Sequence, residues 1–171
     1  MPYSPISLPN MTPTILGISF STRMQGLAVI KSNHLVDYSL KLNKDKWGPL
    51  KRDLLLSSLA SCIQCHTINT ICLSIPPLHQ QTSEFKELYL LIRSLAYQQK
   101  IRLVEYEPKQ LLMLVTATER KTKKVLMESI CAIYPELSLQ YEKEMSNKNK
   151  YYVKLFEAVA CATLFSQGIG I

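Results

Sequence analysis

The chain has 171 residues, of which 47% are hydrophobic and 19% charged, and this composition excludes an intrinsically disordered protein. Its length is enough for one domain with a full core, and no apolar run reaches the roughly 18 residues of a membrane-spanning helix. The formal charge of +7 favours an anionic partner such as nucleic acid, because basic side chains release counterions from phosphates; the alternative is a basic surface that serves only solubility.

The beginning of the chain differs in composition from the rest. Residues 1–12 are rich in Pro and Ser and lack a basic stretch followed by an apolar one, so they predict a loose N-terminal arm and not a secretory signal. Residues 13–168 are expected to form a single domain. Five cysteines, an odd number without disulfide-like spacing, indicate a reduced, cytoplasmic protein.

Three short strands are predicted first, over residues 14–20, 24–31 and 34–42. The third alternates with a period of two, which is typical of an antiparallel strand. Its expected faces are Leu35, Asp37, Ser39 and Lys41 on one side, and Val36, Tyr38, Leu40 and Leu42 on the other.

Helices and strands then alternate. Residues 47–66 predict an amphipathic helix, and its expected apolar face comprises Trp47, Leu50, Leu54, Leu55, Ser58, Leu59, Cys62 and Ile63. A strand at 70–75, a helix at 83–100 capped by Thr82 or Ser83, and a strand at 101–106 come next. Helices at 108–115 and 121–134, a polar exposed loop at 135–150 and a last helix at 151–166 complete the chain. This order predicts an α/β fold, a mixed five-stranded sheet with helices on both faces.

Four stretches carry a family resemblance. Residues 15–30 form a hairpin that includes Arg23 and Gly26, and residues 101–117 read IRLVEYEPKQLLMLVTA. The segments RKTKKVLMESICAIYP and KLFEAVACATLF follow in order. Together they resemble the RuvC-type Holliday-junction resolvases of the RNase H-like superfamily. The resemblance implies an RNase H-like fold.

The resemblance also implies a site of four carboxylates that hold two Mg²⁺ ions. The matching positions in this chain are Ser19, Ser74, Lys154 and Glu157. Only Glu157 is an acid, and a lysine places a positive charge where a dication would bind. We therefore expect a catalytically inactive relative that uses no cofactor, with Mg²⁺ required only if other acids restore the site.

Lys154 and Glu157 are three residues apart and share one face of the last helix. We expect the ammonium to neutralise the carboxylate, with the two serine hydroxyls completing a polar cluster; the alternative is an ordinary surface ion pair worth under roughly 1 kcal/mol. The acids nearest to a substitute role are Asp37, Glu105 and Glu107. Asp37 lies among polar neighbours, which is more typical of a solvated strand face.

Arg120, Lys121, Lys123 and Lys124 open the helix at 121–134. Basic residues oppose the helix dipole there, so their presence suggests an external anion such as phosphate; the alternative is an ordinary solvated turn. Tyr152 would either stack on a base or pack into the core. The helix at 83–100 is either a buried core helix or, as the resemblance implies, the contact of a homodimer.

Cys62-Ile-Gln-Cys65-His66 matches a haem-attachment pattern, but it ends a helix and no second cysteine pair accompanies it for zinc. Packed side chains with an exposed Cys65 are the favoured interpretation.

Three functions follow. The first is binding of branched or structured nucleic acid, DNA or RNA, without cleavage. The second is an active Mg²⁺-dependent junction endonuclease with displaced carboxylates. The third is a protein-interaction scaffold that does not bind nucleic acid.

Overall fold

One mixed sheet of five strands organises the structure, a computed structural model that describes residues 12–116, 120–147 and 151–168. The strands are β1 (Thr14–Phe20), β2 (Met24–Lys31), β3 (His34–Leu42), β4 (Thr70–Ser74) and β5 (Arg102–Tyr106), in the order β3-β2-β1-β4-β5. The first three are antiparallel, whereas β4 is parallel to β1 and β5 is parallel to β4. The predicted α/β fold is confirmed. The predicted arm at residues 1–12 lies outside the described residues except for Thr12.

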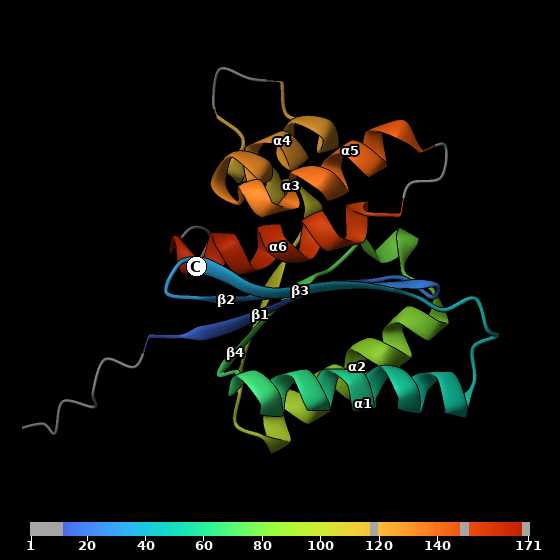
Figure 1. The fold of residues 1–171 in the computed structure, drawn as a ribbon. Helices are drawn as coiled ribbons and strands as arrows, with labels where there is room; N and C mark the ends of the chain where they lie inside the picture. Colours follow the sequence, from blue (N-terminus) through green and yellow to red (C-terminus); the bar gives the residue numbers. More distant parts are fainter. Residues whose placement is uncertain (1–11, 117–119, 148–150, 169–171) are drawn as a thin grey trace, which may run out of the picture.

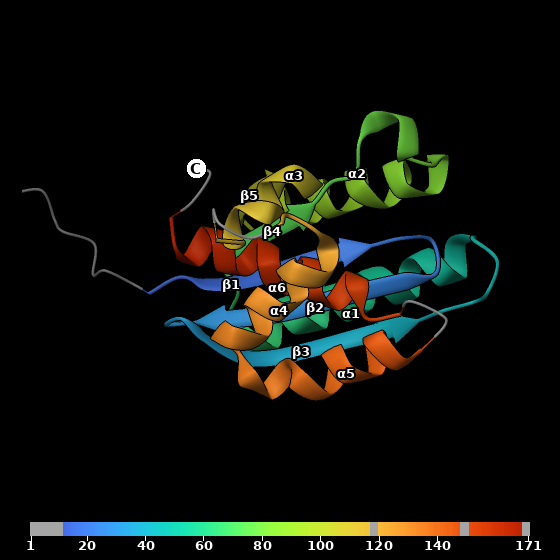
Figure 2. The same cartoon turned by 90° about the horizontal axis from the view of Figure 1, so that it is seen from above.

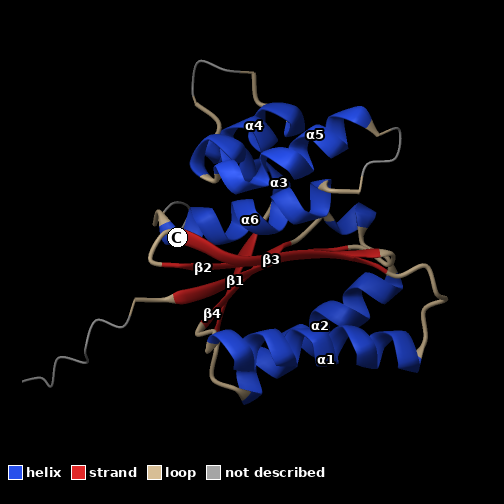
Figure 3. Ribbon diagram, in the orientation of Figure 1, coloured by secondary structure: helices blue, strands red, loops and turns tan. Residues whose placement is uncertain are grey.

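Helices cover both faces of this sheet (Figures 1 and 3). The helices are α1 (Pro49–His66), α2 (Ser83–Gln98), α3 (Pro108–Leu111), α4 (Lys123–Ile133), α5 (Ser138–Ser146) and α6 (Val153–Ser166). Helices α1 and α2 lie on one face; α6 packs on β1, β2 and β4 from the other, and α4 packs on α6. Seen from above, α3 lies near β5 (Figure 2), and α5 packs on α4 in the layer outside α6 (Figure 1). Among the described helices, none has the length and apolarity needed to cross a bilayer.

Strand β1 is buried along its whole length because both of its faces are covered. Leu16, Ile18 and Phe20 point into the core beneath α1 and α2. Ile15 belongs to the core on the α6 side, so the period-two alternation turns Gly17 and Ser19 toward α6 as well. The strand therefore delivers Ser19 to the interface between the sheet and the last helix.

The strict alternation predicted for β3 is wrong at its beginning. Val29 pairs with Asp37 but Ile30 pairs with Leu35, so Val36 is an extra residue in the ladder. Such a bulge reverses the side-chain order on one side of it. Leu35 consequently packs on the α6-side core together with Tyr38, while Val36 is half exposed.

The apolar face predicted for the first helix is wrong at two positions. The helix begins at Pro49, and Leu50 and Leu54 are 75% and 54% exposed. Its buried residues instead follow a narrow stripe with a spacing of four, Lys51, Leu55, Leu59 and Ile63. The leucine-rich sequence supplied more apolar residues than the contact with the sheet can cover.

The exposed loop predicted at 135–150 is also wrong over its described part. A 3₁₀ turn at Pro135–Leu137 leads into α5, and Leu137 and Glu144 are fully buried. The backbone N–H of Tyr152 donates to Oε2 of Glu144 at 2.7 Å. The charged composition hides this helix because most of α5 is solvent-exposed and Glu144, a polar residue, is the one that is buried within it. The other boundaries differ from prediction by one to a few residues.

Candidate functional site

The serines of the predicted site lie side by side at one edge of the sheet. Ser19 is the next-to-last residue of β1, and Ser74 is the last residue of β4. Because β1 and β4 are parallel, their carboxyl ends meet at the same edge. Ser19 is 1% exposed and Ser74 is 3% exposed, so both hydroxyls need partners inside the protein.

Two glycines let helix α6 lie directly on these strands. A Cβ atom at Gly17 would lie 2.0 Å from the carbonyl oxygen of Ala158, and one at Gly26 would lie 2.3 Å from that of Lys154. Both distances are far shorter than van der Waals contact, so any larger residue would push the helix away. Gly26 is the ladder partner of Ser19. The close approach therefore brings the first turns of α6 onto the carboxyl ends of β1 and β4, where Ser19 and Ser74 lie. We call this end of the sheet the serine edge.

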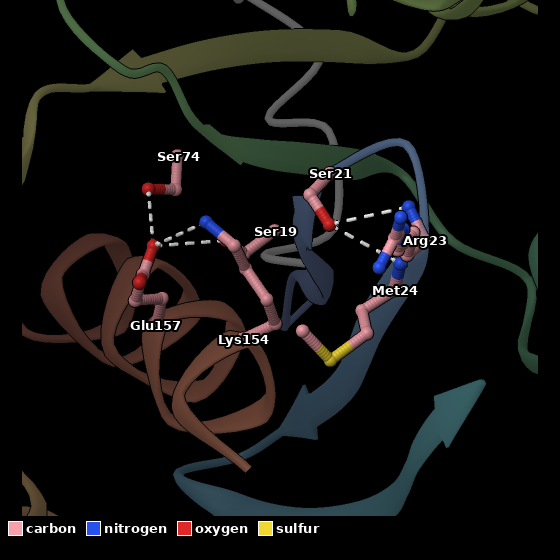
Figure 4. Close-up of polar contacts among 7 residues, drawn as sticks. All are labelled: Ser19, Ser21, Arg23, Met24, Ser74, Lys154 and Glu157. Atoms are coloured by element: carbon pink, nitrogen blue, oxygen red, sulfur yellow. Dashed lines mark hydrogen bonds and ion pairs between the residues drawn. The ribbon is translucent and has the colours of Figure 1, made fainter. Parts of the chain in front are cut away.

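Ser19, Ser74, Lys154 and Glu157 meet there in one polar cluster (Figure 4). Oγ of Ser19 donates to Oε2 of Glu157 at 3.0 Å, and Oγ of Ser74 donates to the same oxygen at 3.3 Å. Nζ of Lys154 lies 3.5 Å from that oxygen. The lysine and glutamate side chains are 25% and 12% exposed, so this ion pair is more shielded than an ordinary surface pair.

The side chains of this cluster do not fit a divalent cation. Mg²⁺ is held by several oxygen ligands, mostly carboxylates and waters, whereas the cluster offers one carboxylate. Three hydrogen-bond or ion-pair donors already engage Oε2 of that carboxylate, one of them an ammonium. Within the described residues, no group of three His, Cys, Asp or Glu side chains is arranged to hold a metal.

The acids considered as substitutes lie elsewhere. Asp37 projects toward α1, where its Oδ2 lies 2.9 Å from Nε2 of His66. Glu105 accepts a hydrogen bond from the hydroxyl of Tyr89 on α2. Glu107 caps α3, where its backbone N–H donates to the side chain of Gln110 at 2.8 Å. None of the three joins Glu157 at the serine edge.

A cavity of about 270 Å³ opens beside the cluster and includes Ser74, Lys154 and Glu157 in its wall. Three further lysines line it, Lys109 from α3, Lys121 before α4 and Lys123 at the start of α4. Its apolar wall consists of Pro76, Pro108, Leu111, Leu112 and Leu126. We call it the lysine cavity. Four lysines and a single acid, Glu157, therefore line this cavity.

The predicted basic segment is thus divided. All four residues are exposed, but only Lys121 and Lys123 line the lysine cavity, and Arg120 and Lys124 are not part of its wall. Lys109 was not predicted, although a signal existed: it follows β5, whose carboxyl end lies at the same edge as that of β4. Tyr152 packs against the core on the α6 side, which favours its structural interpretation.

The turn between β1 and β2 is held by a lysine that no sequence pattern singles out. Lys51 is 4% exposed, and its ammonium donates to the carbonyl oxygens of Thr22, Asn43 and Asp45. Oγ of Ser21 accepts from the backbone N–H of Met24 at 3.2 Å in the same turn (Figure 4). These bonds use all three donors of the ammonium and hold the turn two residues beyond Ser19.

Burial disfavours the thiolate form of the cysteine near Ser74 and Glu157 and of the first cysteine in the haem-like motif. Cys161, one turn beyond Glu157, is fully buried, and burial raises the pKa of its thiol far above the ordinary value. Burial, with Asp37 nearby, raises the pKa of Cys62 to about 11, while Cys65 is exposed. The pairing of His66 with Asp37 occupies the histidine of the motif.

Comparison with solved structures places this arrangement in a known fold. RuvC of Thermus thermophilus in complex with a Holliday-junction substrate superposes with a TM-score of 0.66 at 12% identity, over 88% of this chain and 90% of that one. The fold is RuvC-like. A second structure of Thermus thermophilus RuvC gives a TM-score of 0.65 at 11% identity, covering 91% of this chain and 96% of that chain.

A viral enzyme shows the same fold. The Fowlpox virus resolvase in complex with substrate Holliday-junction DNA has a TM-score of 0.55 at 10% identity, over 91% of this chain and 97% of that chain. No family model matches the sequence, and no curated protein is similar to it in sequence. The likeness is therefore one of fold, and the chemistry of this chain has to be argued from its own side chains.

Proposed function

We propose that this protein binds branched or structured DNA through its RuvC-like fold and does not cleave it. One observation supports this most directly: four lysines and a single acid, Glu157, line the lysine cavity. That charge balance suits phosphate and opposes a dication. The structural neighbours are resolvases captured with Holliday-junction DNA, which makes a junction the first ligand to test.

Binding would be electrostatic and independent of metal. Lys121 and Lys123 sit at the beginning of α4, where the positive end of the helix dipole adds to the charge of their side chains. Each phosphate neutralised by such a lysine contributes a slope of about −0.9 to the logarithm of affinity against the logarithm of salt concentration. The protein in this account is a binding subunit and not an enzyme.

The experiment measures the affinity for a labelled four-way junction in EDTA over a range of salt concentrations. We expect tight binding that weakens with salt, and a smaller salt slope for Lys121→Gln/Lys123→Gln. Lys31→Gln is the matched control because Lys31 is exposed and pairs with Thr14 at the far end of β1 from Ser19. Junction cleavage on adding Mg²⁺ would show instead that the protein is an active endonuclease. Absence of junction binding at low salt would favour a protein-interaction scaffold that does not bind nucleic acid.

The dimer is a second part of the proposal. On the outer side of α2, Leu90 is 59% exposed and Tyr97 is 86% exposed, although Phe85, Leu88 and Ile92 are buried in the core. These two side chains lie seven residues apart on one helix face and offer apolar area to a second copy. Light scattering should give a dimer that Leu90→Glu/Tyr97→Glu converts to a monomer; an unchanged mass would exclude α2 as the contact.

A further inference from the structure

We propose that the lysine cavity is a binding pocket for a phosphomonoester of nucleotide size, held by direct contact with lysine side chains and without a divalent cation. The two sources of this chemistry are a free nucleotide and the phosphorylated end of a nucleic-acid strand. The inference deepens the proposed function and rests on it where the source is a strand end. It differs from the site implied by the fold, because an anion and not a metal is the ligand.

The first argument is charge. Lys109, Lys121 and Lys123 form no ion pair with any acid in the described part of the chain, and only Lys154 has a carboxylate partner. Positive charges on lysines that line one cavity repel one another, and an anion bound among them would relieve this repulsion. A phosphomonoester carries a charge of about −1.5 to −2 at neutral pH, more than a diester within a strand, and so matches this pocket better.

The second argument is shape. The wall is contributed by segments far apart in the sequence, since it includes Pro76 after β4, Leu112 after α3, Leu126 in α4 and Lys154 in α6. Its volume of about 270 Å³ lies just below the range of small-molecule pockets, roughly 300–1,000 Å³. A cavity of this size can enclose a nucleotide or a strand end, whereas a duplex can only pass across its mouth.

The third argument is polarity. The lysines stand against an apolar wall that includes Pro76, Pro108 and Leu111. Such a wall makes no favourable contact with inorganic phosphate, whereas a sugar or base can bury apolar surface against it. Ligand pockets commonly combine an apolar lining with a few charged groups that fix orientation. The occupant is therefore expected to be an organic phosphate.

The test compares a short single-stranded oligonucleotide with and without a 5′-phosphate, together with dAMP and inorganic phosphate, all in EDTA. We expect the phosphorylated strand to bind about tenfold more tightly than its unphosphorylated twin, as charge-assisted hydrogen bonds to one phosphate would give. Adding Mg²⁺ should leave this ratio unchanged. Competition by dAMP at similar concentration would identify a free nucleotide as the ligand, and failure of dAMP to compete would identify the strand end.

Two variants separate the pocket from the surface around it. Lys109→Gln should abolish the preference for the phosphorylated strand, and Leu112→Trp should do the same by filling the cavity without changing its charge. Lys31→Gln should keep the preference. Equal affinity for the two strands in the natural protein, or a preference that survives both pocket variants, would overturn the inference.

The outcome is separable from that of the proposed function. The protein could bind a junction with unphosphorylated ends tightly and show no preference for the 5′-phosphate. This result would support the proposed function and contradict the phosphate pocket. A strong preference for the phosphate in a protein that binds the junction no better than a single strand would do the reverse.

Discussion

A Cβ atom placed on Gly26 would lie 2.3 Å from the carbonyl oxygen of Lys154, because α6 rests directly on the backbone of β2. The next nearest atoms, at 2.5 and 2.7 Å, are also backbone, so no side chain can rotate away to make room. The position of the polar cluster thus depends on a residue that contributes no functional group to it.

Gly26→Ala should therefore destabilise the protein by about 1–3 kcal/mol or more, as overpacking of a close contact does. Chemical denaturation at neutral pH measures the loss. Gly48→Ala is the control, since a Cβ atom there meets nothing within 4 Å; it should cost at most about 1 kcal/mol through the weaker N-cap of α1. Equal losses for the two variants would contradict the role assigned to the contact.

The Lys154–Glu157 pair should show its coupling in a double-mutant cycle. Lys154→Met leaves the carboxylate, 12% exposed, without its counterion, and should cost about 1–2 kcal/mol after allowance for partial exposure. Glu157→Gln should cost less, because Lys154 is 25% exposed and can turn to solvent. In the double variant the losses should be less than additive; strict additivity in urea unfolding would show that the pair is an independent surface contact.

Restoring acids at the serine edge should restore a response to metal. The natural protein is expected to keep the same Tm in Mg²⁺ and in EDTA. Ser19→Asp/Ser74→Glu/Lys154→Asp adds three carboxylates beside Glu157 and removes the ammonium. This variant should be less stable in EDTA through like-charge repulsion and should regain about 2.7 kcal/mol when Mg²⁺ is a hundredfold above its Kd. A rise in the Tm of the natural protein with Mg²⁺ would instead indicate that carboxylates at other positions bind the metal.

Part of this site could be predicted because the family resemblance matches Ser19, Ser74, Lys154 and Glu157 to the positions of one site. Helical spacing alone places only Lys154 and Glu157 on a common face. The remainder depends on tertiary contacts that leave no periodic signal. The position of Lys109 after β5 indicates the right end of the sheet, but its place in the cavity wall also depends on the packing of α3 against α6.

The errors have physical causes of the same kind. A bulge at Val36 cannot be seen in a strand that alternates regularly, because the extra residue is defined by its partner strand. From sequence alone, Lys51 is expected to be a solvated residue. In the folded protein three carbonyl groups accept hydrogen bonds from its ammonium. In both cases the decisive partner, strand β2 for the bulge and three loop carbonyls for Lys51, is not visible in the local pattern of the residue itself.

Lys51→Met should therefore cost far more than a surface lysine substitution. The change leaves the carbonyls of Thr22, Asn43 and Asp45 without this donor in a buried setting, and a loss of about 2–4 kcal/mol is expected. Lys46→Met, in the same loop but exposed, should stay within about 0.5 kcal/mol of the natural protein. Thermal unfolding followed by circular dichroism measures both, and similar Tm values would show that the ammonium is dispensable.

Glu87 should make stability depend on pH. Its carboxylate accepts from Nε1 of Trp47 at 2.9 Å and from Arg52 at 2.8 Å, and these hydrogen bonds hold its pKa below the ordinary value. A pKa that is lower in the folded state gives a contribution that is complete above the unfolded pKa, about 4.3, and is lost as pH falls through the folded value.

Glu87→Gln should accordingly be less stable than the natural protein at pH 7, and the difference should shrink as the pH falls from about 5 to about 3. The measurement is the unfolding free energy of both proteins across that range at low ionic strength. Glu142→Gln, at an exposed position on α5, is the control and should show a small, nearly constant difference. A gap for Glu87→Gln that widens on acidification would reverse the assigned sign and would mean that the folded state favours the protonated carboxyl.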